Sequence, residues 1–269
     1  MKERIDDLLA GFGLDQWGVC SFESLPVLLN CRAKSRLPQN AATVLVFLFP
    51  YYVGEFPQRN VSRYVLADDY HHLTGQLLTQ VTEGLGHIFP QEQWVWFVDN
   101  SPIPEVSAAW LAGLGVIGRN GQLINQRYGS YTFIGCVVTT LALEPGSPLQ
   151  GSCLNCGKCF AACPTGALRA EGFEKERCLS HITQKKGELT PWEQEQVAAG
   201  GFIWGCDRCQ DACPHNASPL LTPLQGFREN IQPVLTEENL PRLVEQKAYN
   251  WRGESVLRRN AKLIADKNG

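Results

Sequence analysis

The sequence predicts an α+β protein made of three consecutive parts. We expect a mixed α/β sheet domain over residues 1–145, a cysteine-rich module over residues 146–225 and a short helical tail over residues 226–269. Two patterns predict this division. Helical spacing alternates with short β-branched runs before residue 145, and eight of the eleven cysteines lie between Cys153 and Cys213. With 269 residues and 44% hydrophobic content, the chain is long enough for two domains with buried cores.

The elements of the first part follow from the spacing of its apolar residues. Helical spacing is found in two sets of residues, which are Ile5, Leu8, Leu9 and Phe12, and then Leu73, Leu77, Val81 and Leu85. Short runs rich in β-branched and aromatic residues predict strands over residues 44–51, 94–98 and 131–141. The loop Pro145-Gly146-Ser147-Pro148 then marks a boundary before the cysteine-rich module.

The cysteine spacing of the module is typical of a ferredoxin-like domain with two [4Fe–4S] clusters. Each of two cysteine runs ends in Cys-Pro, and the last cysteine of such a run binds the other cluster. Cluster one is therefore expected to bind Cys153, Cys156, Cys159 and Cys213. The second run has Ile203 where its first cysteine would stand, so the isolated Cys178 completes the other set. Cluster two is expected to bind Cys163, Cys178, Cys206 and Cys209.

Zinc and disulfides are the two alternatives for these cysteines. Zinc also takes four thiolates from CxxC pairs, but its sites seldom interlock in CxxCxxCxxxCP order. The first 25 residues contain acids instead of an apolar signal-peptide core, and no apolar run is long enough to span a membrane. We therefore expect a cytoplasmic protein with reduced thiols and no membrane partner.

Outside the module, Cys20 and Cys136 lie in apolar surroundings typical of buried thiols, and Cys31 is given no role.

The segment Gly113-Leu-Gly115-Val-Ile-Gly118 satisfies the GxGxxG pattern of dinucleotide-binding proteins. That pattern is informative only between a strand and the helix it opens, with an acid about 20 residues later. Here it follows a helical stretch over residues 106–112, and no acid follows at that distance. We interpret it as a turn that lets the backbone approach a core or a large cofactor closely, and not as a nicotinamide site.

Asp99 follows the predicted strand over residues 94–98 and opens a loop, which is where catalytic side chains are often displayed. An apolar setting there would raise the pKa of the carboxyl group and make it a proton donor near neutral pH. From these features alone, an aspartate that caps a loop is the commoner interpretation.

Several ordered motifs together resemble the epoxyqueuosine reductase family over roughly residues 40–220. They are Arg63-Tyr64 with Asp69-Tyr70-His71, Val98-Asp99-x-x-Pro102-x-x-Glu105, Gly113 to Asn120, Leu123-Ile124-Asn125 with Tyr128-Gly129-Ser130, and the cysteine module with Arg177-Cys178 and Asp207. Members of that family use cobalamin and two [4Fe–4S] clusters to reduce the epoxide of epoxyqueuosine in a tRNA anticodon, giving queuosine and water.

The resemblance implies specific roles for residues of the first part. It makes the sheet domain the cobalamin-binding domain and Asp99 the general acid. The expected cobalamin contacts are Arg63, Tyr70, His71, Gly113, Gly115, Gly118, Asn120, Gly129 and Ser130. The segment Asp69-x-His71-x-x-x-Gly75 nearly matches a cobalt-ligating DxHxxG motif, but its glycine is one place late. His71 is therefore expected to be a structural or pocket residue and not an axial ligand.

The partners implied by the resemblance are the tRNA anticodon stem-loop and an external one-electron donor such as flavodoxin or ferredoxin. The chain departs from the family in having Val106 where a basic residue usually follows Glu105, and in lacking a long C-terminal helical-repeat region. The net charge is −3, so tRNA would have to meet a local basic patch. The segment over residues 247–262 has a local net charge of +4, and this is equally typical of a solvated helix face. Other candidates for this contact are Arg32, Lys34, Arg36, Arg63, Arg119 and Arg127.

Two other classes of function stay open from the sequence. One is a corrinoid iron–sulfur reductase that acts on another small electrophile, such as an organohalide. The other is a non-enzymatic electron carrier, although a carrier has no use for the 145 residues that precede the module.

Overall fold

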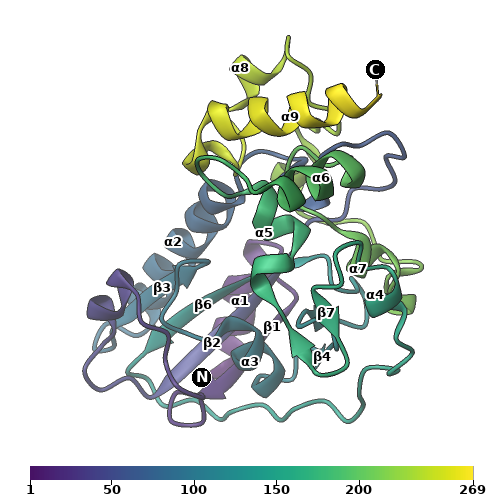
Figure 1. The fold of residues 1–269 in the computed structure, drawn as a ribbon. Helices are drawn as coiled ribbons and strands as arrows, with labels where there is room; N and C mark the ends of the chain where they lie inside the picture. Colours follow the sequence, from purple (N-terminus) through teal and green to yellow (C-terminus); the bar gives the residue numbers. More distant parts are fainter. Residues whose placement is uncertain (269) are drawn as a thin grey trace. The chain divides into compact units, whose positions relative to one another are not determined.

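The computed structural model describes residues 1–268, and the chain divides into two compact units (Figure 1). Unit 1 comprises Met1–Tyr51, His71–Leu154 and Pro219–Leu224. Unit 2 comprises Tyr52–Tyr70, Asn155–Ser218 and the segment from Gln225 onward.

Unit 1 is built around a four-stranded antiparallel sheet. Its elements are α1 (Lys2–Gly11), β1 (Trp17–Ser21), η1 (Arg32–Arg36), β2 (Thr43–Pro50), α2 (Tyr70–Ile88), β3 (Trp94–Val98), α3 (Glu105–Leu111), β4 (Val116–Ile117), β5 (Leu123–Ile124) and β6 (Thr132–Thr139). The strand order of the sheet is β1-β2-β6-β3, and Figure 1 shows these strands side by side. The predicted helices and strands match α1, α2, β2, β3 and β6 closely, whereas β1 was not predicted because its five residues alternate only weakly.

Both faces of this sheet are covered, because every residue of β2 is buried. On one face, alternate residues of β2 pack against Ala108 and Ala109 of α3. On the other face, Gly135 of β6 lies under Phe49 and under Leu78 of α2, where a Cβ atom would be within 3 Å of both side chains. The buried β2 and β6 therefore fix the position of β3, which pairs with β6 at the edge and delivers Asp99.

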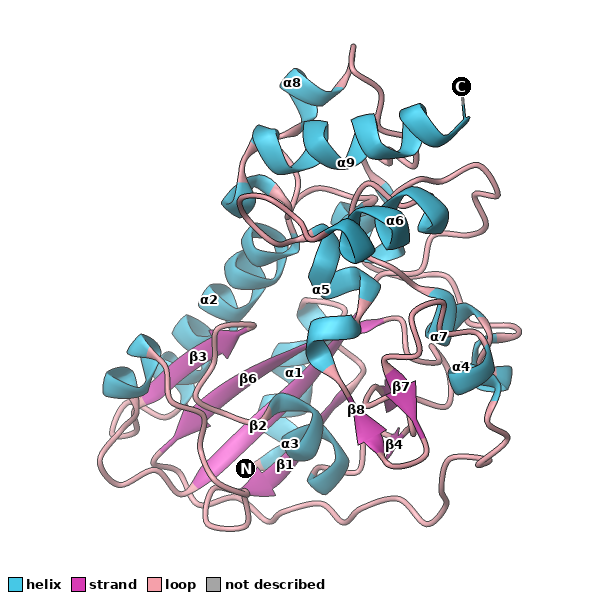
Figure 2. Ribbon diagram, viewed as in Figure 1, coloured by secondary structure: helices cyan, strands magenta, loops and turns pink. Residues whose placement is uncertain are grey.

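Unit 2 consists mainly of helices and loops (Figure 2). Its elements are η2 (Arg63–Val65), α4 (Lys158–Ala161), β7 (Leu168–Arg169), β8 (Gly172–Phe173), η3 (Lys175–Arg177), α5 (Leu179–Thr183), α6 (Pro191–Gly200), α7 (Arg208–Asp211), η4 (Pro214–Asn216), η5 (Gln225–Arg228), α8 (Leu240–Leu243), η6 (Asn250–Arg252) and α9 (Glu254–Asn268). Helix α6 begins with a capping box in which Thr190 and Glu193 exchange hydrogen bonds, and it ends at Gly201 in the left-handed conformation.

The two units differ from the three predicted parts because both units are assembled from separated segments of the chain. Val61 forms a parallel bridge with Trp204, and both side chains are fully buried. The predicted tail supplies Tyr249 and Leu257 to the same apolar core. The tail and residues 52–70 thus join the cysteine module because their apolar side chains are buried together with it.

Candidate functional site

Asp99 stands directly after β3, as the sequence predicted, and its backbone adopts a left-handed conformation with φ of 58°. Aspartate tolerates this conformation better than most residues with a side chain. Its carboxylate is 61% exposed, and its Oδ2 lies 3.1 Å from Nε2 of His71 in the first turn of α2. The site therefore presents an acid and an imidazole together at the end of a buried strand.

The apolar setting expected around Asp99 is found instead at Glu105, in the first turn of α3. Burial raises the pKa of the Glu105 carboxyl well above its usual range, and the Asp99 charge raises it further. Hydrogen bonds from the Asp99 backbone and the Ser101 side chain, together with the charge of His71, act in the opposite direction. Oε1 of Glu105 is buried and has no hydrogen-bond partner. Sequence reasoning named Glu105 only as part of a family motif, because nothing in the chain shows that its carboxyl is buried.

Gly75 has a packing role that explains its place in the incomplete DxHxxG motif. A Cβ atom at Gly75 would lie 3.3 Å from the indole ring of Trp96 on β3, so the glycine lets α2 approach the sheet. His71 is one turn away and interacts with Asp99. Gly75 thus has a packing role, and the expectation that His71 is not an axial ligand stays a prediction.

The glycines of the GxGxxG segment lie between α3 and β4, so the segment does not open a helix. A Cβ atom at Gly113 would lie 2.6 Å from the Ser147 carbonyl oxygen, and one at Gly115 would lie 2.5 Å from the Ile124 carbonyl oxygen. At Gly118 a Cβ atom would meet the side chain of Asn120 at 2.5 Å. These glycines allow close packing within unit 1, and because the segment opens no helix it lacks the structural context of a dinucleotide fingerprint.

Asn120 offers a group that a cofactor could use. Its Oδ1 accepts a hydrogen bond from the Gln122 backbone at 3.3 Å, but its Nδ2 is buried and has no partner. A buried donor without an acceptor is costly, and a corrinoid carries amide side chains that could accept this hydrogen bond. Gly129 and Ser130, the other candidates in this unit, are buried in the turn before β6.

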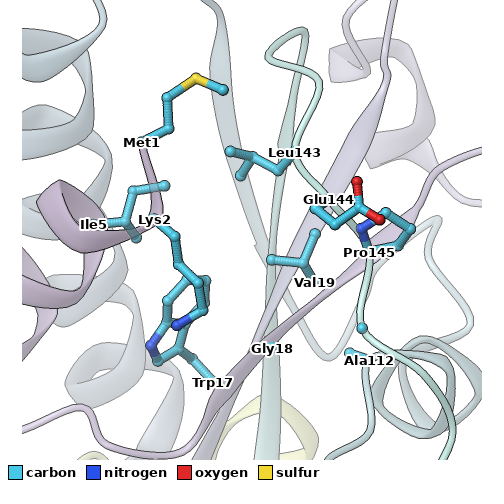
Figure 3. A pocket seen from close by; sticks show the side chains of 11 residues that line it. Met1, Lys2, Ile5, Trp17, Gly18, Val19, Ala112, Leu143, Glu144 and Pro145 are labelled. Carbon is cyan, nitrogen blue, oxygen red and sulfur yellow. The ribbon is translucent and has the colours of Figure 1, made fainter.

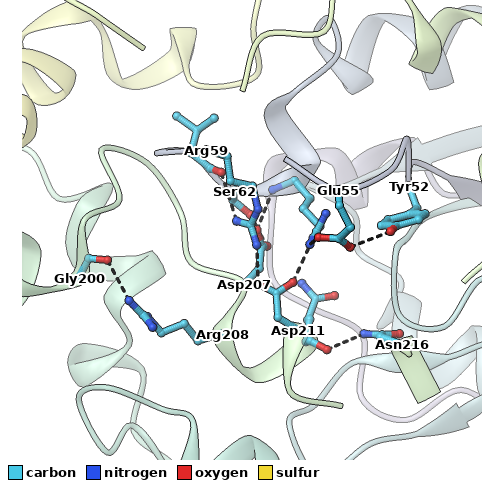
Figure 4. A network of polar contacts seen from close by, with 12 residues as sticks. Tyr52, Glu55, Arg59, Ser62, Gly200, Asp207, Arg208, Asp211 and Asn216 are labelled. Atoms are coloured by element: carbon cyan, nitrogen blue, oxygen red, sulfur yellow. Dashed lines mark hydrogen bonds and ion pairs between the residues drawn. The ribbon is translucent and has the colours of Figure 1, made fainter. Parts of the chain in front are cut away.

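Arg63 and Tyr70 belong to unit 2. Figure 4 shows part of a network of charged side chains in this unit, with Glu55, Arg59, Asp207 and Asp211 labelled. Arg63 is only 6% exposed and forms ion pairs with Glu55 at 2.7 Å and Asp211 at 3.0 Å. Its guanidinium also donates to the Gly54 carbonyl and lies over the Tyr52 ring. Arg63 therefore stabilises unit 2, and its predicted cobalamin contact stays a prediction. Tyr70 is half-buried and contacts the ring of Tyr64 edge-on.

Asp207 is the centre of this network and is fully buried between Cys206 and Cys209. Its carboxylate accepts hydrogen bonds from the Ser62 hydroxyl, the Arg63 backbone amide at 2.7 Å and the Arg59 guanidinium at 2.9 Å. Burial raises the pKa of Asp207, and the Arg59 charge and the hydrogen bonds oppose that rise. The network holds the second cysteine run against residues 59–63, and nothing in the sequence marked Arg59 or Ser62 for this role.

The cysteines predicted for cluster two come together in unit 2. The Cys209 thiol is close enough to those of Cys163, Cys178 and Cys206 for their charges to interact. Burial raises the pKa of Cys206 and of Cys209 to about 12 in the absence of iron. Among residues 1–268, no three His, Cys, Asp or Glu side chains are grouped so that they could hold one metal ion. Thiolates around a cubane bind different irons and so stand farther apart than those around one zinc ion.

Ile203 explains why the second run has only three cysteines. Its side chain is 4% exposed and belongs to the apolar core of unit 2, so this position is used for packing. The isolated Cys178 lies at the start of α5, and its thiol is close to those of Cys206 and Cys209.

The cysteines predicted for cluster one are more accessible. Cys156 is exposed, whereas Cys153, Cys159 and Cys213 are half-buried. Helix α4 carries Cys159 and packs against α7, which is followed by Cys213. This packing brings together the two runs that the crossover pattern joins.

The basic tail provides less free positive charge than its sequence indicated. Lys247 is fully buried, and its ammonium donates to the carbonyl oxygens of Leu66 and Asn230 and to Asp68. Arg259 donates to the carbonyl oxygens of Lys185 and Gly187. These cations stabilise unit 2, and the prediction that they contact nucleic acid is wrong for Lys247.

The exposed basic residues of unit 1 are also partly engaged. Arg127 pairs with Asp15 at 2.5 Å, and Arg36 donates to the Trp96 carbonyl oxygen while lying over the Phe97 ring. Arg32, Lys34 and Arg119 are exposed.

A cavity of about 560 Å³ lies in unit 1, and Asp99 is not among the residues that line it (Figure 3). It is lined by the start of α1, by Trp17 to Val19 of β1, by Ala112 and by residues 143–146. Its lining is largely apolar, and Lys2 is already paired with Asp6 and lies over the Trp17 ring. Without convergent polar groups, this cavity is a poor candidate for an active site.

Two family models match the chain in the regions that carry these features. Residues 152–216 match a 4Fe-4S double cluster binding domain, and residues 32–100 match the family described as epoxyqueuosine reductase QueG, DUF1730. Across the part of the chain that is described, no helix is both long and apolar enough to cross a membrane.

Curated relatives match over most of the chain. An epoxyqueuosine reductase of Synechocystis is 32% identical over 232 residues, which are 82% of this chain and 79% of the relative. One of Lactococcus garvieae is 32% identical over 216 residues, which are 77% of this chain and 61% of the relative. The chain thus spans about three fifths of the length of the second relative.

Solved structures share the fold. The epoxyqueuosine reductase of Streptococcus thermophilus aligns over 100% of this chain and 81% of its own, with a TM-score of 0.84 and 24% identity. Another epoxyqueuosine reductase, crystallised with an epoxyqueuosine-modified tRNA-Tyr stem loop, aligns over 98% of this chain and 80% of its own, with a TM-score of 0.83 and 23% identity. A reductive dehalogenase described as B12-dependent aligns over 98% of this chain but 35% of its own, with a TM-score of 0.54 and 18% identity.

Proposed function

This chain belongs to the epoxyqueuosine reductase family, and on that premise we propose that it reduces the epoxide of epoxyqueuosine in tRNA to queuosine. The observation that carries the proposal is the placement of Asp99, an exposed acid paired with His71 at the end of β3 in a chain of this family. We propose Asp99 as the general acid. The reaction takes up two electrons and two protons, and the epoxide oxygen leaves as water.

The electrons would be relayed by two [4Fe–4S] clusters held by unit 2 and Cys153. The proximity of Cys163, Cys178, Cys206 and Cys209 supports the ligand set proposed for cluster two. The contact between α4 and α7 supports the set of Cys153, Cys156, Cys159 and Cys213 for cluster one. When bound, the clusters supply single electrons from an external donor such as flavodoxin or ferredoxin.

Cobalamin is the second cofactor of the proposal, and when bound it supplies a strongly reducing cobalt centre. The residues of this chain fit such a group at Asn120, whose buried Nδ2 lacks an acceptor. The further proposed contacts are those predicted from the sequence, Arg63, Tyr70, His71, Gly113, Gly115, Gly118, Gly129 and Ser130. Since Nε2 of His71 already lies within hydrogen-bond distance of Asp99, we propose that His71 orients the acid and does not ligate cobalt.

Asp99 suits the proton-transfer step because its carboxyl group is exposed and accessible to a substrate. A general acid must come within hydrogen-bond reach of the departing oxygen, and Asp99 is exposed in a loop that follows a fixed strand. The imidazole of His71 orients this carboxyl and restricts its rotation. The chain thus positions the proton donor through its own residues.

The proposed macromolecular substrate is the anticodon stem-loop of tRNA. The exposed side chains of Arg32, Lys34 and Arg119 are the candidates for phosphate contacts in unit 1. We also propose a cytoplasmic location, because the two clusters require thiols that stay reduced.

The decisive experiment uses anaerobically reconstituted protein with cobalamin and an epoxyqueuosine-modified anticodon stem-loop. We expect conversion to queuosine, measured by mass spectrometry of the nucleosides, with a strong chemical reductant as the electron source. Protein that contains both clusters and cobalamin but leaves the epoxide intact would contradict the proposal. The fold shared with a reductive dehalogenase makes a halogenated phenol the comparison substrate, and dehalogenation without epoxide reduction would favour that second function.

The ligand sets are tested separately by iron and sulfide analysis. We expect about eight irons and eight sulfides per chain, as two four-iron clusters require. Cys178→Ala should impair cluster two and leave cluster one largely intact. Loss of cluster one alone in this variant would show that the sets are assigned wrongly.

A further inference from the structure

The connection between β1 and β2 carries two apolar side chains that the packing of unit 1 does not use. Val27 is 90% exposed and Leu29 is 51% exposed, whereas Leu28 between them packs against an apolar core of this unit. Single exposed aliphatic residues are common on protein surfaces, but two of them close together can mark a binding surface. What lies beside this part of the chain therefore decides how they are interpreted.

This part of the chain runs along β3 and the loop that follows it. Three of its groups contact backbone carbonyl oxygens there: the Leu29 amide donates to Pro102 at 2.8 Å, the Cys31 thiol lies 3.8 Å from Asn100, and the Arg36 guanidinium donates to Trp96 at 3.1 Å. The partner positions fall as the donor positions rise, so residues 27–36 run antiparallel to residues 96–102. Because β3 is an edge strand of the sheet, these residues cover its free edge. We call residues 27–36 the edge segment.

The edge segment also concentrates positive charge. Residues 24–40 contain three cations and no acid, although the whole chain has a net charge of −3. Arg36 is bonded to β3, but Arg32 and Lys34 are exposed, and neither forms an ion pair in the part of the chain that the structure describes. Ala33 between them packs against the core, as Leu28 does. The segment thus exposes two cations and two apolar side chains beside the loop that carries Asp99.

We propose that the edge segment is a docking site for single-stranded RNA, in which Arg32 and Lys34 contact phosphates while Val27 and Leu29 contact the faces of unstacked bases. An RNA loop offers both groups, because its bases are splayed out between charged phosphates, whereas a duplex hides the faces of its bases. The inference rests on the proposed function for the identity of the RNA. It deepens that function by assigning base contacts to two apolar residues.

The backbone contacts place this docking site next to the proposed proton donor. The Leu29 amide is bonded to Pro102, which follows Asp99 by three residues. The edge segment is therefore fixed to the same loop as the acid. An RNA loop held along the segment would bring a neighbouring nucleotide to the Asp99 carboxyl group.

The test measures RNA affinity by fluorescence anisotropy at several salt concentrations. The protein is loaded with its cofactors, and the probe is an unmodified anticodon stem-loop. The cation variant combines Arg32→Gln with Lys34→Gln, and the apolar variant combines Val27→Ser with Leu29→Ser. All four side chains are exposed, so both variants should fold like the parent, which circular dichroism can verify.

The two variants should weaken binding in different ways. Each lost phosphate contact of a single strand reduces the slope of log affinity against log salt concentration by about 0.7, so the cation variant should lower this slope by about 1.4. The apolar variant should lower the affinity about tenfold and keep the parent's slope, because its contacts release no counterions. For a fully paired RNA duplex without a loop, the apolar variant should bind as well as the parent.

Matched controls remove the same chemistry elsewhere. Leu221→Ser replaces an apolar side chain of unit 1 that is 55% exposed, close to the exposure of Leu29. Lys2→Gln combined with Lys186→Gln removes two exposed cations. Both controls should keep the parent's affinity and salt dependence.

An apolar variant that binds the stem-loop as tightly as the parent would overturn the proposal, and so would a cation variant with an unchanged salt slope. A parent that binds no stem-loop at any salt concentration would overturn it as well. Epoxide reduction is measured separately, and both variants should raise KM with little change in kcat because Asp99 is intact. If the variants lose RNA affinity as expected but the parent converts no epoxide, the docking site stands and the proposed function fails. If all variants convert the epoxide with the parent's KM, the docking site fails and the proposed function stands.

Discussion

The surroundings of Asp99 in unit 1 and Asp207 in unit 2 show two ways to hold a carboxylate. Asp207 is fully buried and accepts three hydrogen bonds, two of them from residues Arg59 and Arg63. Asp99 is 61% exposed, and its Oδ2 lies 3.1 Å from Nε2 of His71. A carboxylate that is buried among donors fixes structure, whereas an exposed one can exchange a proton with a substrate. The comparison teaches that exposure, and not residue type, separates the two roles.

The largest effect is expected for Asp99→Asn, which keeps the shape of the side chain but removes its transferable proton. Loss of a positioned general acid typically lowers the rate by about 10²- to 10⁴-fold. Stability, iron content and the cobalamin spectrum should not change, because the carboxyl is exposed and holds no cofactor in the proposal. Turnover of epoxyqueuosine within a few-fold of the parent would make Asp99 a loop-capping residue.

The opposite behaviour is expected for Asp207→Ala. This change removes one acceptor of the buried Arg59 guanidinium and the acceptor of the Arg63 backbone amide, and breaking a buried ion pair typically costs about 3–5 kcal/mol. Urea unfolding monitored by circular dichroism should show this loss, together with lower iron content of cluster two. Asp266→Ala, at an exposed position of α9, is the control. An Asp207→Ala protein as stable as this control would contradict the structural role of Asp207.

A smaller effect is expected in the pH dependence of stability at Glu105. Its folded pKa is raised above the unfolded value near 4.5, so the stability that its neutral form contributes is present below that pH. This contribution is lost as the pH rises through the folded pKa. Glu105→Gln cannot ionise, so its free energy of unfolding should increase relative to the parent as the pH rises from about 5 to 8. Parallel curves for the two proteins would show that the Glu105 carboxyl does not titrate differently on folding.

The smallest effect on stability is expected for His71→Ala. The His71 and Asp99 side chains are 37% and 61% exposed, and pairs of this kind contribute about 0–1 kcal/mol. We expect little change in thermal unfolding but a measurable fall in kcat, because the acid loses its orienting partner. The cobalt(II) electron paramagnetic resonance spectrum should be the same as in the parent. Loss of a nitrogen hyperfine signal in this variant would instead make His71 an axial ligand.

Local patterns in the sequence predicted the elements that carry both sites. The hydrophobic run over residues 94–98 became β3, and Asp99 follows it as expected. Cysteine spacing singled out Cys178, which lies near Cys209 although 31 residues separate them in the chain. The strand and the proximity of the thiols could be predicted because the signal lies in adjacent residues or in a fixed ligand spacing, and the binding of the clusters stays a prediction.

Tertiary contacts account for what the sequence could not predict. Lys247 has the composition of a surface cation, yet it is buried because Leu66, Asp68 and Asn230 supply oxygen acceptors from distant segments. Arg63 likewise forms ion pairs with Glu55 and Asp211, which lie 8 and 148 residues away in the chain. No short stretch of sequence contains both partners of such a contact. The sequence therefore could not show that these charged side chains are buried and paired.

The segmented construction of unit 2 has a consequence for how the protein is made. Arg59 and Ser62 leave the ribosome well before Asp207, their partner about 150 residues later in the chain, has been synthesised. The core around Val61 and Trp204 is completed later still, when Tyr249 and Leu257 arrive. Translation therefore delivers the four thiols of the Cys209 quartet before the fold that surrounds them is finished. Iron loading of that quartet would then be a late, post-synthetic event, and an interrupted chain would expose unprotected thiols.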